Sequence, residues 1–309
     1  SPTCARNPEP GEFNAAPYYS GPLFETHLHV PSVLPPPKII RDKLGLGQEY
    51  ATLGEEITIE KIVCLMDKEN TTRAVAFFPV VDFPFMRRPF IDIAKRTVRQ
   101  YPERIIPFML PTPFTAPAPE PSALKKILDK GNGAFKGYGE LPFYWDEYRD
   151  LSPDDPMFLE SYDLLEERGL AVMIHPAEGQ VDALETAFQH NPDVIFILHG
   201  MNQDSVSNLL QTYENAYYTL DSSILPLFSE ENFHVLLQEA VLYWKDIVET
   251  NPEKVMWGTD RFTTWSYDEE VGRVIEEFYR AFIARLDPEV QELYAYKNAE
   301  RVFGNPESK

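Results

Sequence analysis

Eight short apolar segments, each followed by a longer amphipathic stretch, constrain the fold of this chain more than any other feature. The short segments are rich in β-branched and aromatic residues and are bounded by turn residues, which is typical of buried strands. They are LFETHLHV (23–30), RAVAFFPV (73–80), RIIPFMLP (104–111), AFKGYGEL (134–141), LAVMIHPA (170–177), VIFILHGM (194–201), AYYTLDSS (216–223) and VMWGTDRF (255–262).

The stretches between these segments have the spacing of helices. The expected helices span Ile57–Asn70, Pro89–Tyr101, Ser122–Lys130 with Ser122 as N-cap, Met157–Arg168, Val181–His190, Gln203–Tyr213, Glu230–Glu249, Tyr267–Arg285 and about Pro288–Phe303. Strict alternation of strand and helix over this length predicts a (β/α)8 TIM barrel of the α/β class. We therefore expect one barrel domain over residues 23–309, preceded by an extended, proline-rich arm over residues 1–22.

The charge balance narrows the range of partners. The chain of 309 residues carries 28 Lys and Arg against 49 Asp and Glu, a formal net charge of −21. A surface this acidic repels phosphate backbones and anionic lipids, so neither nucleic acid nor a membrane surface is an expected partner. No apolar run approaches the ~18 residues that would predict a membrane span. The expected partner is a small-molecule substrate, and homo-oligomerisation is left open.

Two cysteines, Cys4 and Cys64, are too few for a disulfide framework or a zinc ribbon. Cys4 lies in the arm, where a free thiol is the favoured interpretation. The alternative is a lipid attachment site exposed by removal of a signal peptide, although the preceding Ser-Pro-Thr fits that pattern poorly. Localisation is therefore left between the cytoplasm and export.

Ionisable side chains gather at the carboxyl ends of the predicted strands. His27 and His29 are two residues apart on the first strand, so both are expected to face the barrel mouth. The fourth, fifth, sixth and eighth strands end with Glu140, His175, His199 and Asp260. Long loops follow at the same end, over residues 31–56, 81–88, 111–121 and 142–156. Barrel enzymes build their active sites at this face.

A buried cluster of this kind needs partners for its polar atoms. Each unsatisfied polar group in a dry core costs ~1–3 kcal/mol, and an unpaired charge costs more. A divalent cation resolves the conflict, because imidazole nitrogen and carboxylate oxygen suit zinc as well as manganese, iron or cobalt. The alternative is that each histidine hydrogen-bonds a carbonyl or water at a wet mouth. All these residues together favour a metal site.

These residues resemble the metal ligands of the amidohydrolase superfamily. Glu-Thr-His-Leu-His at 25–29 is similar to the first-strand H-x-H motif, and His175, His199 and Asp260 match the fifth-, sixth- and eighth-strand positions. NPEKVMWGTDRF (251–262) and KNAERVFG (297–304) resemble the closing signatures of the amidohydrolase-2 branch. The resemblance covers about residues 22–304. That branch contains metal-dependent hydrolases, lactonases and non-oxidative decarboxylases.

The resemblance implies a role for each matched residue. His27, His29 and His175 would bind the metal. Asp260 would be a ligand, or would accept a proton from the metal-activated water. His199 would bind a second metal or polarise the substrate. The chemistry is sound on general grounds, because a bound metal lowers the pKa of water towards ~7 and an adjacent carboxylate accepts its proton.

The fourth strand decides the number of metal ions. In two-metal relatives a carboxylated lysine or a glutamate bridges the ions at this strand. Glu140 lies at the mouth and is a candidate bridge, with a structural carboxylate paired to an arginine or lysine as the alternative. Lys136 lies about four residues deeper, roughly 13 Å at the rise of a strand, and is the poorer bridge. One divalent metal, with zinc the favoured identity, is preferred slightly over two.

Other residues are candidates for substrate binding or support. Arg88 and Arg261 follow the second and eighth strands, where a guanidinium can hold a substrate carboxylate. Trp145, next to Tyr144 in the loop after the fourth strand, is a candidate pocket wall. Asp221 is either a partner of a ligand histidine or a turn residue. Glu25 is expected to be a hydrogen-bonding support.

Three functions follow from these features. The leading one is metal-dependent hydrolysis of a lactone, ester or amide, with Asp260 as proton acceptor. The second is non-oxidative decarboxylation of an aromatic or unsaturated acid on the same metal, which a cationic clamp in the pocket would favour. The third is a metal-binding barrel without catalysis.

Overall fold

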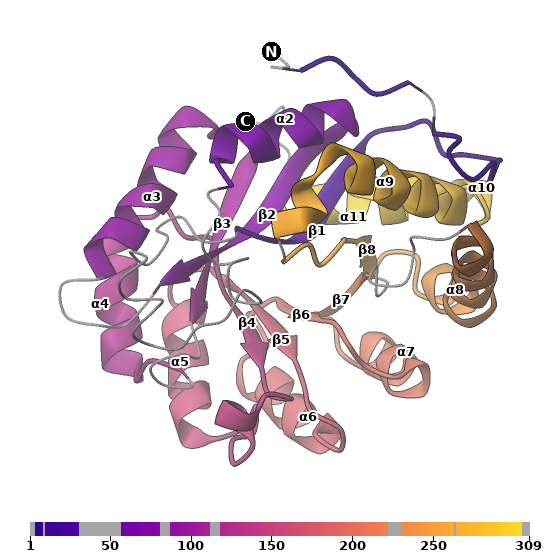
Figure 1. The fold of residues 1–309 in the computed structure, drawn as a ribbon. Coiled ribbons are helices and arrows are strands. Elements are labelled where there is room, and N and C mark those ends of the chain that lie inside the picture. The colour runs from indigo at the N-terminus through magenta and orange to yellow at the C-terminus, as the bar shows by residue number, and fades with distance from the viewer. Residues whose placement is uncertain are drawn as a thin grey trace.

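The eight predicted strands form one barrel. The computed structural model describes residues 4–8, 10–30, 57–80, 87–111, 118–221, 230–262 and 264–304. Within these ranges, parallel strands lie side by side in the order β1 to β8, and helices surround them (Figure 1). The strands are β1 (Leu23–His29), β2 (Thr71–Val80), β3 (Ile105–Pro111), β4 (Gly137–Pro142), β5 (Ala171–His175), β6 (Phe196–Leu198), β7 (Ala216–Leu220) and β8 (Val255–Trp257).

Helices follow the strands as the periodicity predicts. They are α2 (Ile59–Lys68), α3 (Arg87–Gln100), α4 (Pro121–Gly131), α5 (Pro156–Glu166), α6 (Val181–His190), α7 (Gln203–Thr212), α8 (Glu230–Thr250), α9 (Glu269–Ile283), α10 (Pro288–Glu292) and α11 (Asn298–Phe303). The short 3-10 helices η2 (Asp146–Tyr148) and η3 (Thr264–Tyr267) and the π-helix η4 (Leu293–Lys297) are also present. The described helices include none with the combined length and apolarity needed to cross a bilayer.

The first and last strands meet and close the ring. Leu28 forms a parallel bridge with Arg261, just beyond β8. The N–H of Asp260 donates to the carbonyl of His27 at 2.8 Å, and the N–H of His29 donates to the carbonyl of Arg261 at 2.8 Å. The predicted (β/α)8 barrel is thereby confirmed. The closure also places Asp260 beside the two histidines of β1.

Several predicted boundaries differ from the structure. The prediction of Ser122 as N-cap is wrong: Glu120 is the N-cap of α4 and Pro121 takes the first position, where its missing N–H leaves no bond unmade. β6 and β8 end three or more residues before the predicted points. The backbone leaves the extended conformation at Gly200 and Asp260, where φ is positive, although His199 and Asp260 still donate single hydrogen bonds to the neighbouring strands. The predicted last helix is interrupted by the π-turn η4.

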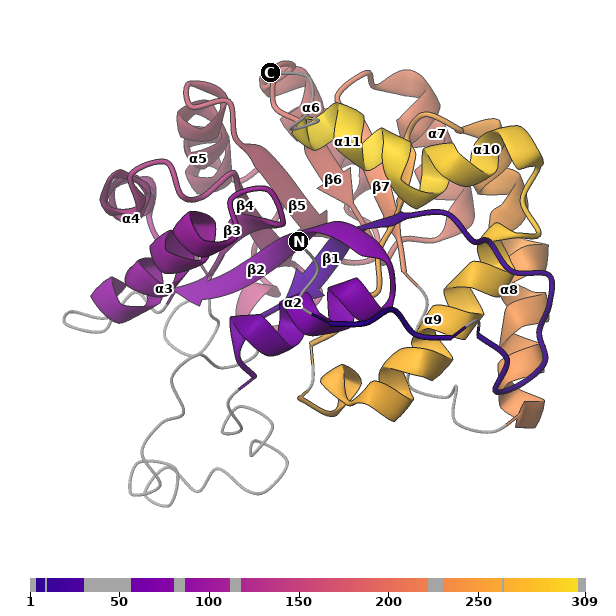
Figure 2. The same ribbon diagram turned by 90° about the horizontal axis from the view of Figure 1, so that it is seen from above.

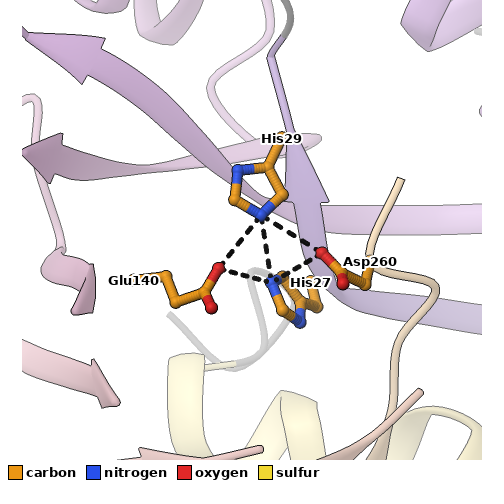
Figure 3. Close-up of side chains that lie close together, drawn as sticks. All are labelled: His27, His29, Glu140 and Asp260. Atoms are coloured by element: carbon orange, nitrogen blue, oxygen red, sulfur yellow. Dashed lines mark hydrogen bonds and ion pairs between the residues drawn. The ribbon is translucent and has the colours of Figure 1, made fainter. Parts of the chain in front are cut away.

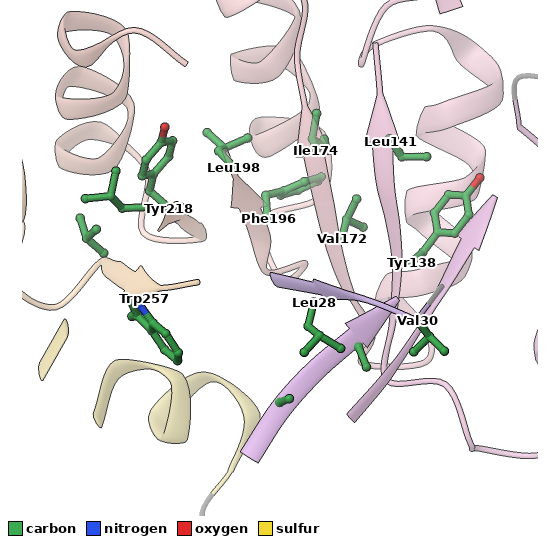
Figure 4. Close-up of a cluster of buried hydrophobic side chains, with 14 of the residues drawn as sticks. Leu28, Val30, Tyr138, Leu141, Val172, Ile174, Phe196, Leu198, Tyr218 and Trp257 are labelled. Carbon is green, nitrogen blue, oxygen red and sulfur yellow. The ribbon is translucent and has the colours of Figure 1, made fainter. Parts of the chain in front are cut away.

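Two buried layers hold the barrel together. Side chains such as Phe24, Phe77, Phe108 and Met173 fill its interior, and Phe303 of α11 packs against Phe24 and Phe108 with ring centroids 5.9 Å apart. A larger layer lies between the strands and the helices, and Figure 4 shows part of it. Full burial of one such side chain contributes about 1.5–3 kcal/mol. The strand ends are thus held on a rigid frame.

The N-terminal arm is fixed to the barrel. Cys4 forms a disulfide with Cys64 of α2, so the predicted free thiol is wrong, and the Cys4 sulfur is not free for a lipid thioether. Farther along, the buried carboxylate of Glu277 accepts the N–H groups of Phe13 and Ala15. Figure 2 shows the arm running along α2 and α9 before it enters β1. Disulfides persist mainly in oxidising compartments.

Replacing Cys4 by serine is expected to lower the free energy of unfolding by about 4 kcal/mol, because the disulfide spans a sequence separation of 60 residues. Urea unfolding of the oxidised wild type and the variant measures the difference. Reduced wild type is the matched control and should unfold with the variant. Equal midpoints for oxidised wild type and variant would show that the crosslink does not stabilise the fold.

Candidate metal centre

Ionisable side chains from six strands converge at the carboxyl end of the barrel. They are His27 and His29 of β1, Glu140 of β4, His175 of β5, His199 just after β6, Asp221 just after β7 and Asp260 beyond β8. They reach one point because the strands are parallel and all end at this face. His27, Glu140 and His199 are buried, whereas the Asp260 side chain is 31% exposed and marks the open side.

The first group of donor atoms has the spacing of a zinc site. It comprises the Nε2 atoms of His27 and His29, Oε2 of Glu140 and Oδ1 of Asp260 (Figure 3). Each histidine nitrogen lies between 3.2 and 3.4 Å from the other and from both carboxylate oxygens. Ligands ~2.0–2.1 Å from a tetrahedral zinc ion are about 3.3 Å apart. The residues present therefore fit a bound divalent cation.

A second group of donors shares Glu140 with the first. Oε1 of Glu140 lies 2.7 Å from Nε2 of His199 and 3.2 Å from Nδ1 of His175. The two oxygens of one carboxylate thus face different pairs of histidines. Three protein donors are the number that a catalytic zinc site uses when a further position is kept for water or substrate.

Acidic residues behind the donors orient the imidazoles. Oδ2 of Asp221 lies 3.0 Å from Nδ1 of His27 and 3.3 Å from Nδ1 of His199. Because a carboxylate accepts hydrogen bonds, the contact with His27 favours a proton on its Nδ1, which leaves the Nε2 lone pair for a metal. Oε1 of Glu25 accepts the N–H of His27 at 2.9 Å and that of Thr259 at 2.8 Å. Of the two roles considered for Asp221, the structure shows the histidine partner.

The close contacts shift the titration of the cluster. Burial lowers the pKa of His27, but the carboxylates of Asp260, Asp221 and Glu140 outweigh burial and raise the pKa well above its ordinary value. Burial raises the pKa of Glu140, but His199 and His175 outweigh it and hold that pKa well below the ordinary value. Burial lowers the pKa of His199, but the carboxylates of Glu140 and Asp221 outweigh it and raise that pKa to about 9. Protons and a metal ion therefore compete for the same nitrogens.

The predicted cationic clamp is not assembled by Arg261. Its guanidinium is 3% exposed and forms a bidentate pair with Glu69, with Nη2–Oε1 at 2.8 Å and Nη1–Oε2 at 3.1 Å. Because this buried guanidinium faces Glu69 and not the mouth, the prediction that Arg261 binds substrate is corrected. Arg88 lies in the first turn of α3, and its side chain is outside the described residues. Residues 31–56, 81–86 and 112–117 of the predicted loops are also outside them.

Aromatic side chains lie beside the second donor group. Tyr144 is 51% exposed, and its ring centroid lies 3.9 Å from that of His175. Trp145 is 39% exposed and contacts Tyr144 edge-on, so it lies one ring farther from the donors. The sequence does not distinguish Tyr144 from the other loop aromatics, although its position four residues after Glu140 is a usable signal. Lys136 precedes β4 and contributes nothing to the cluster.

Replacing Gly200 by alanine is expected to weaken zinc binding at least about 10-fold. Gly200 has a φ of +71°, and an added Cβ would lie 2.1 Å from Nε2 of His175, so the imidazole must move. Gly179→Ala is the matched control, because Gly179 also has a positive φ of +84° but open space around its Cβ position. Titration with zinc against a chelating dye compares the two variants. Equal affinities would show that His175 takes no part in zinc binding.

The comparisons with known proteins agree with the barrel fold. No curated protein matches the chain. Among solved structures, an amidohydrolase from Burkholderia multivorans with bound zinc has a TM-score of 0.67 and 11% identity, covering 93% of this chain and 100% of that one. A 2,6-dihydroxybenzoate decarboxylase from Rhizobium has a TM-score of 0.57 and 13% identity, covering 92% and 98%.

A dihydroorotase from Campylobacter jejuni has a TM-score of 0.52 and 11% identity, covering 94% of this chain and 87% of that one. At these identities the likeness establishes a shared barrel fold. The family model described as Amidohydrolase, of the amidohydrolase-2 type, matches residues 26–304. Because that match spans most of the sequence, the chain belongs to the amidohydrolase-2 family and is an enzyme of that type.

Proposed function

We propose that this protein is a zinc-dependent hydrolase that cleaves a C–O or C–N bond of a small lactone, ester or amide, and that its residues would hold two ions, with Glu140 offering one oxygen to each. The observation that carries the proposal is the shared carboxylate. One oxygen of Glu140 faces His27 and His29, and the other faces His175 and His199. This arrangement suits two ions better than the single ion that the sequence favoured.

Each ion would have its own set of protein ligands. The first would be held by His27, His29, Asp260 and one oxygen of Glu140, and the second by the other oxygen of Glu140 with His175 and His199. When bound, the ions supply Lewis-acid chemistry that lowers the pKa of water and polarises a substrate carbonyl.

Asp260 is the proposed proton acceptor. Its Oδ1 lies 3.2 Å from the Nε2 atoms of both His27 and His29, and its side chain is open to the mouth. Its backbone N–H is bound to the carbonyl of His27, which fixes the carboxylate beside the donor atoms. In this position Asp260 takes the proton of the attacking water and returns it to the leaving group. His27 keeps its orientation through Asp221.

Decarboxylation of an aromatic or unsaturated acid is the second candidate. The half-exposed ring of Tyr144 beside His175 offers a face on which a planar substrate can stack, which favours it. Against it stands Arg261, which is paired with Glu69 and does not supply the expected clamp. A metal-binding barrel without catalysis is the third candidate, and Asp260 in reach of the donors argues against it.

An activity panel distinguishes the three functions. Protein purified without chelator is assayed on lactones, aryl esters, amides and hydroxybenzoates, then after chelation, and again after zinc is restored. We expect hydrolysis of at least one class, lost with chelator and regained with zinc. His27→Ala should be inactive. The control is His190→Ala, which should match the wild type, because His190 lies on α6 and pairs with Asp163. Release of carbon dioxide instead would assign decarboxylation, and no turnover by zinc-loaded protein would assign a binding barrel.

A further inference from the structure

We propose that the buried ion pair between Glu69 and Arg261 positions Asp260 against the two histidines of β1. This inference rests on the proposed function, because it assigns a mechanical role toward the same metal site. Glu69 and Arg261 are positioning residues: neither touches the donor atoms, and both act through the backbone of Asp260.

Asp260 and Arg261 are neighbours whose side chains have different partners. Oδ1 of Asp260 lies 3.2 Å from Nε2 of both His27 and His29. The next side chain, Arg261, extends to Glu69 with both arms of its guanidinium bonded. Anchoring one side chain in the protein therefore limits where the other can point.

The backbone at this point is bonded to β1. Asp260 donates its N–H to the carbonyl of His27 at 2.8 Å, and the carbonyl of Arg261 accepts the N–H of His29 at 2.8 Å. The hydroxyl of Tyr267 also donates to the carbonyl of His29. These bonds hold the segment along β1, and the Arg261 side chain ties it to α2. Together they define the position of the Asp260 carboxylate.

Glu69 is itself held by a buried arginine. Its carbonyl, at the C-cap of α2, accepts Nη2 of Arg280 at 2.6 Å. Arg280 also bonds Glu276 on α9 at 2.8 Å and the carbonyls of Tyr19 and Gly21, the residues that lead into β1. Figures 1 and 2 both show α2 and α9 side by side. The anchor for Arg261 is thus part of a fixed frame.

A glycine on α9 leaves the space that the pair occupies. A Cβ at Gly272 would lie 2.9 Å from Oε1 of Glu69 and 3.8 Å from Nη2 of Arg261. Glycine is among the poorest residues for a helix interior, so alanine would be preferred here if space allowed. This close approach of Gly272 to the ion pair does not depend on the charges. It indicates that the position of the pair in the fold is constrained.

A buried ion pair is a weak source of stability, because desolvation of the two charges offsets their attraction. Replacing both partners by apolar residues of similar size is often neutral for folding. This separates a positioning role from a stabilising one. The double variant Glu69→Met/Arg261→Met should fold, yet it should lose the constraint on Asp260.

The test compares three variants by zinc affinity, measured with a competing chelator, and by the visible spectrum of the cobalt(II)-substituted protein. We expect the double variant to bind zinc about 10- to 100-fold more weakly than the wild type, with an altered cobalt spectrum. Gly272→Ala should act in the same direction while keeping both charges. Asp67→Asn is the matched control: it removes another carboxylate at the end of α2, one that pairs with Arg104 at 2.8 Å. It should lower thermal stability and leave zinc affinity unchanged.

Two results would overturn the inference. If the folded double variant and Gly272→Ala both bind zinc as tightly as the wild type with the same cobalt spectrum, the pair is structural only. If Asp67→Asn weakens zinc binding as much as the double variant does, the effect reflects general loss of stability. Failure of wild-type protein to bind zinc at all is a different result, because it overturns the proposed function itself.

Discussion

Replacing Glu140 by glutamine is expected to reduce turnover by more than about 100-fold. This exceeds the loss of activity that is usual when a residue that only hydrogen-bonds a metal ligand is replaced. One oxygen of the carboxylate lies beside His27 and His29, and the other lies beside His175 and His199. Glutamine keeps the size but turns one of the two oxygens into an NH2 group, which cannot bind a cation. Steady-state kinetics on the substrate found in the panel, with zinc analysis of the same sample, measures the effect.

The matched control for Glu140 is Glu160→Gln, the same exchange at an exposed position of α5. It should leave both turnover and zinc content unchanged. A Glu140→Gln enzyme that retains two equivalents of zinc and full turnover would contradict the shared-carboxylate site. Loss of zinc from one position with full activity would support a one-ion mechanism instead.

Replacing Asp260 by asparagine is expected to lower turnover by about 100- to 10,000-fold, the range for loss of a general base. Asparagine cannot take up the proton of the attacking water. His27, His29 and Glu140 remain as donors, so zinc should still bind, although more weakly, and the rate is compared at saturating zinc. The measurement is the maximal rate at zinc saturation, together with the zinc content of each preparation.

Asp221→Asn provides the comparison for Asp260. Asp221 lies on the Nδ1 side of His27 and His199, away from the reacting groups. Its loss should therefore lower activity about 10- to 100-fold, mainly through weaker zinc binding. If Asp260→Asn is as active as wild type when zinc-loaded, Asp260 is not the proton acceptor. If Asp221→Asn is the more damaging change at zinc saturation, the two roles are reversed.

The parts of the site that follow from local pattern could be predicted from the sequence. His27 and His29 share a face because side chains alternate along a strand. His175, His199 and Asp260 were placed by their positions at the ends of apolar runs, and the parallel barrel brings those ends together. The structure gathers them, with Glu140, into overlapping groups of candidate metal ligands.

The remaining features of the site depend on which segments that are distant in sequence meet in the fold. Local sequence patterns carry little information on such contacts. Glu140 is 113 residues from His27 in sequence, so its place between two histidine pairs follows from barrel closure. Arg261 was interpreted as a substrate clamp because it follows Asp260, but its partner Glu69 lies 192 residues away on α2. The Cys4–Cys64 disulfide likewise joins the arm to a helix that sequence periodicity does not place beside it.

The measurement that tests the central claim most directly is metal stoichiometry by elemental analysis, on protein purified without chelator and on His27→Ala. We expect about two equivalents of zinc or a similar divalent ion per wild-type chain, as in two-metal hydrolases, and a clear loss in the variant. One equivalent at full activity would contradict the role of Glu140 as a bridge. A protein that is folded by circular dichroism but contains no metal would contradict the metal centre. The histidines would then be hydrogen-bonding residues.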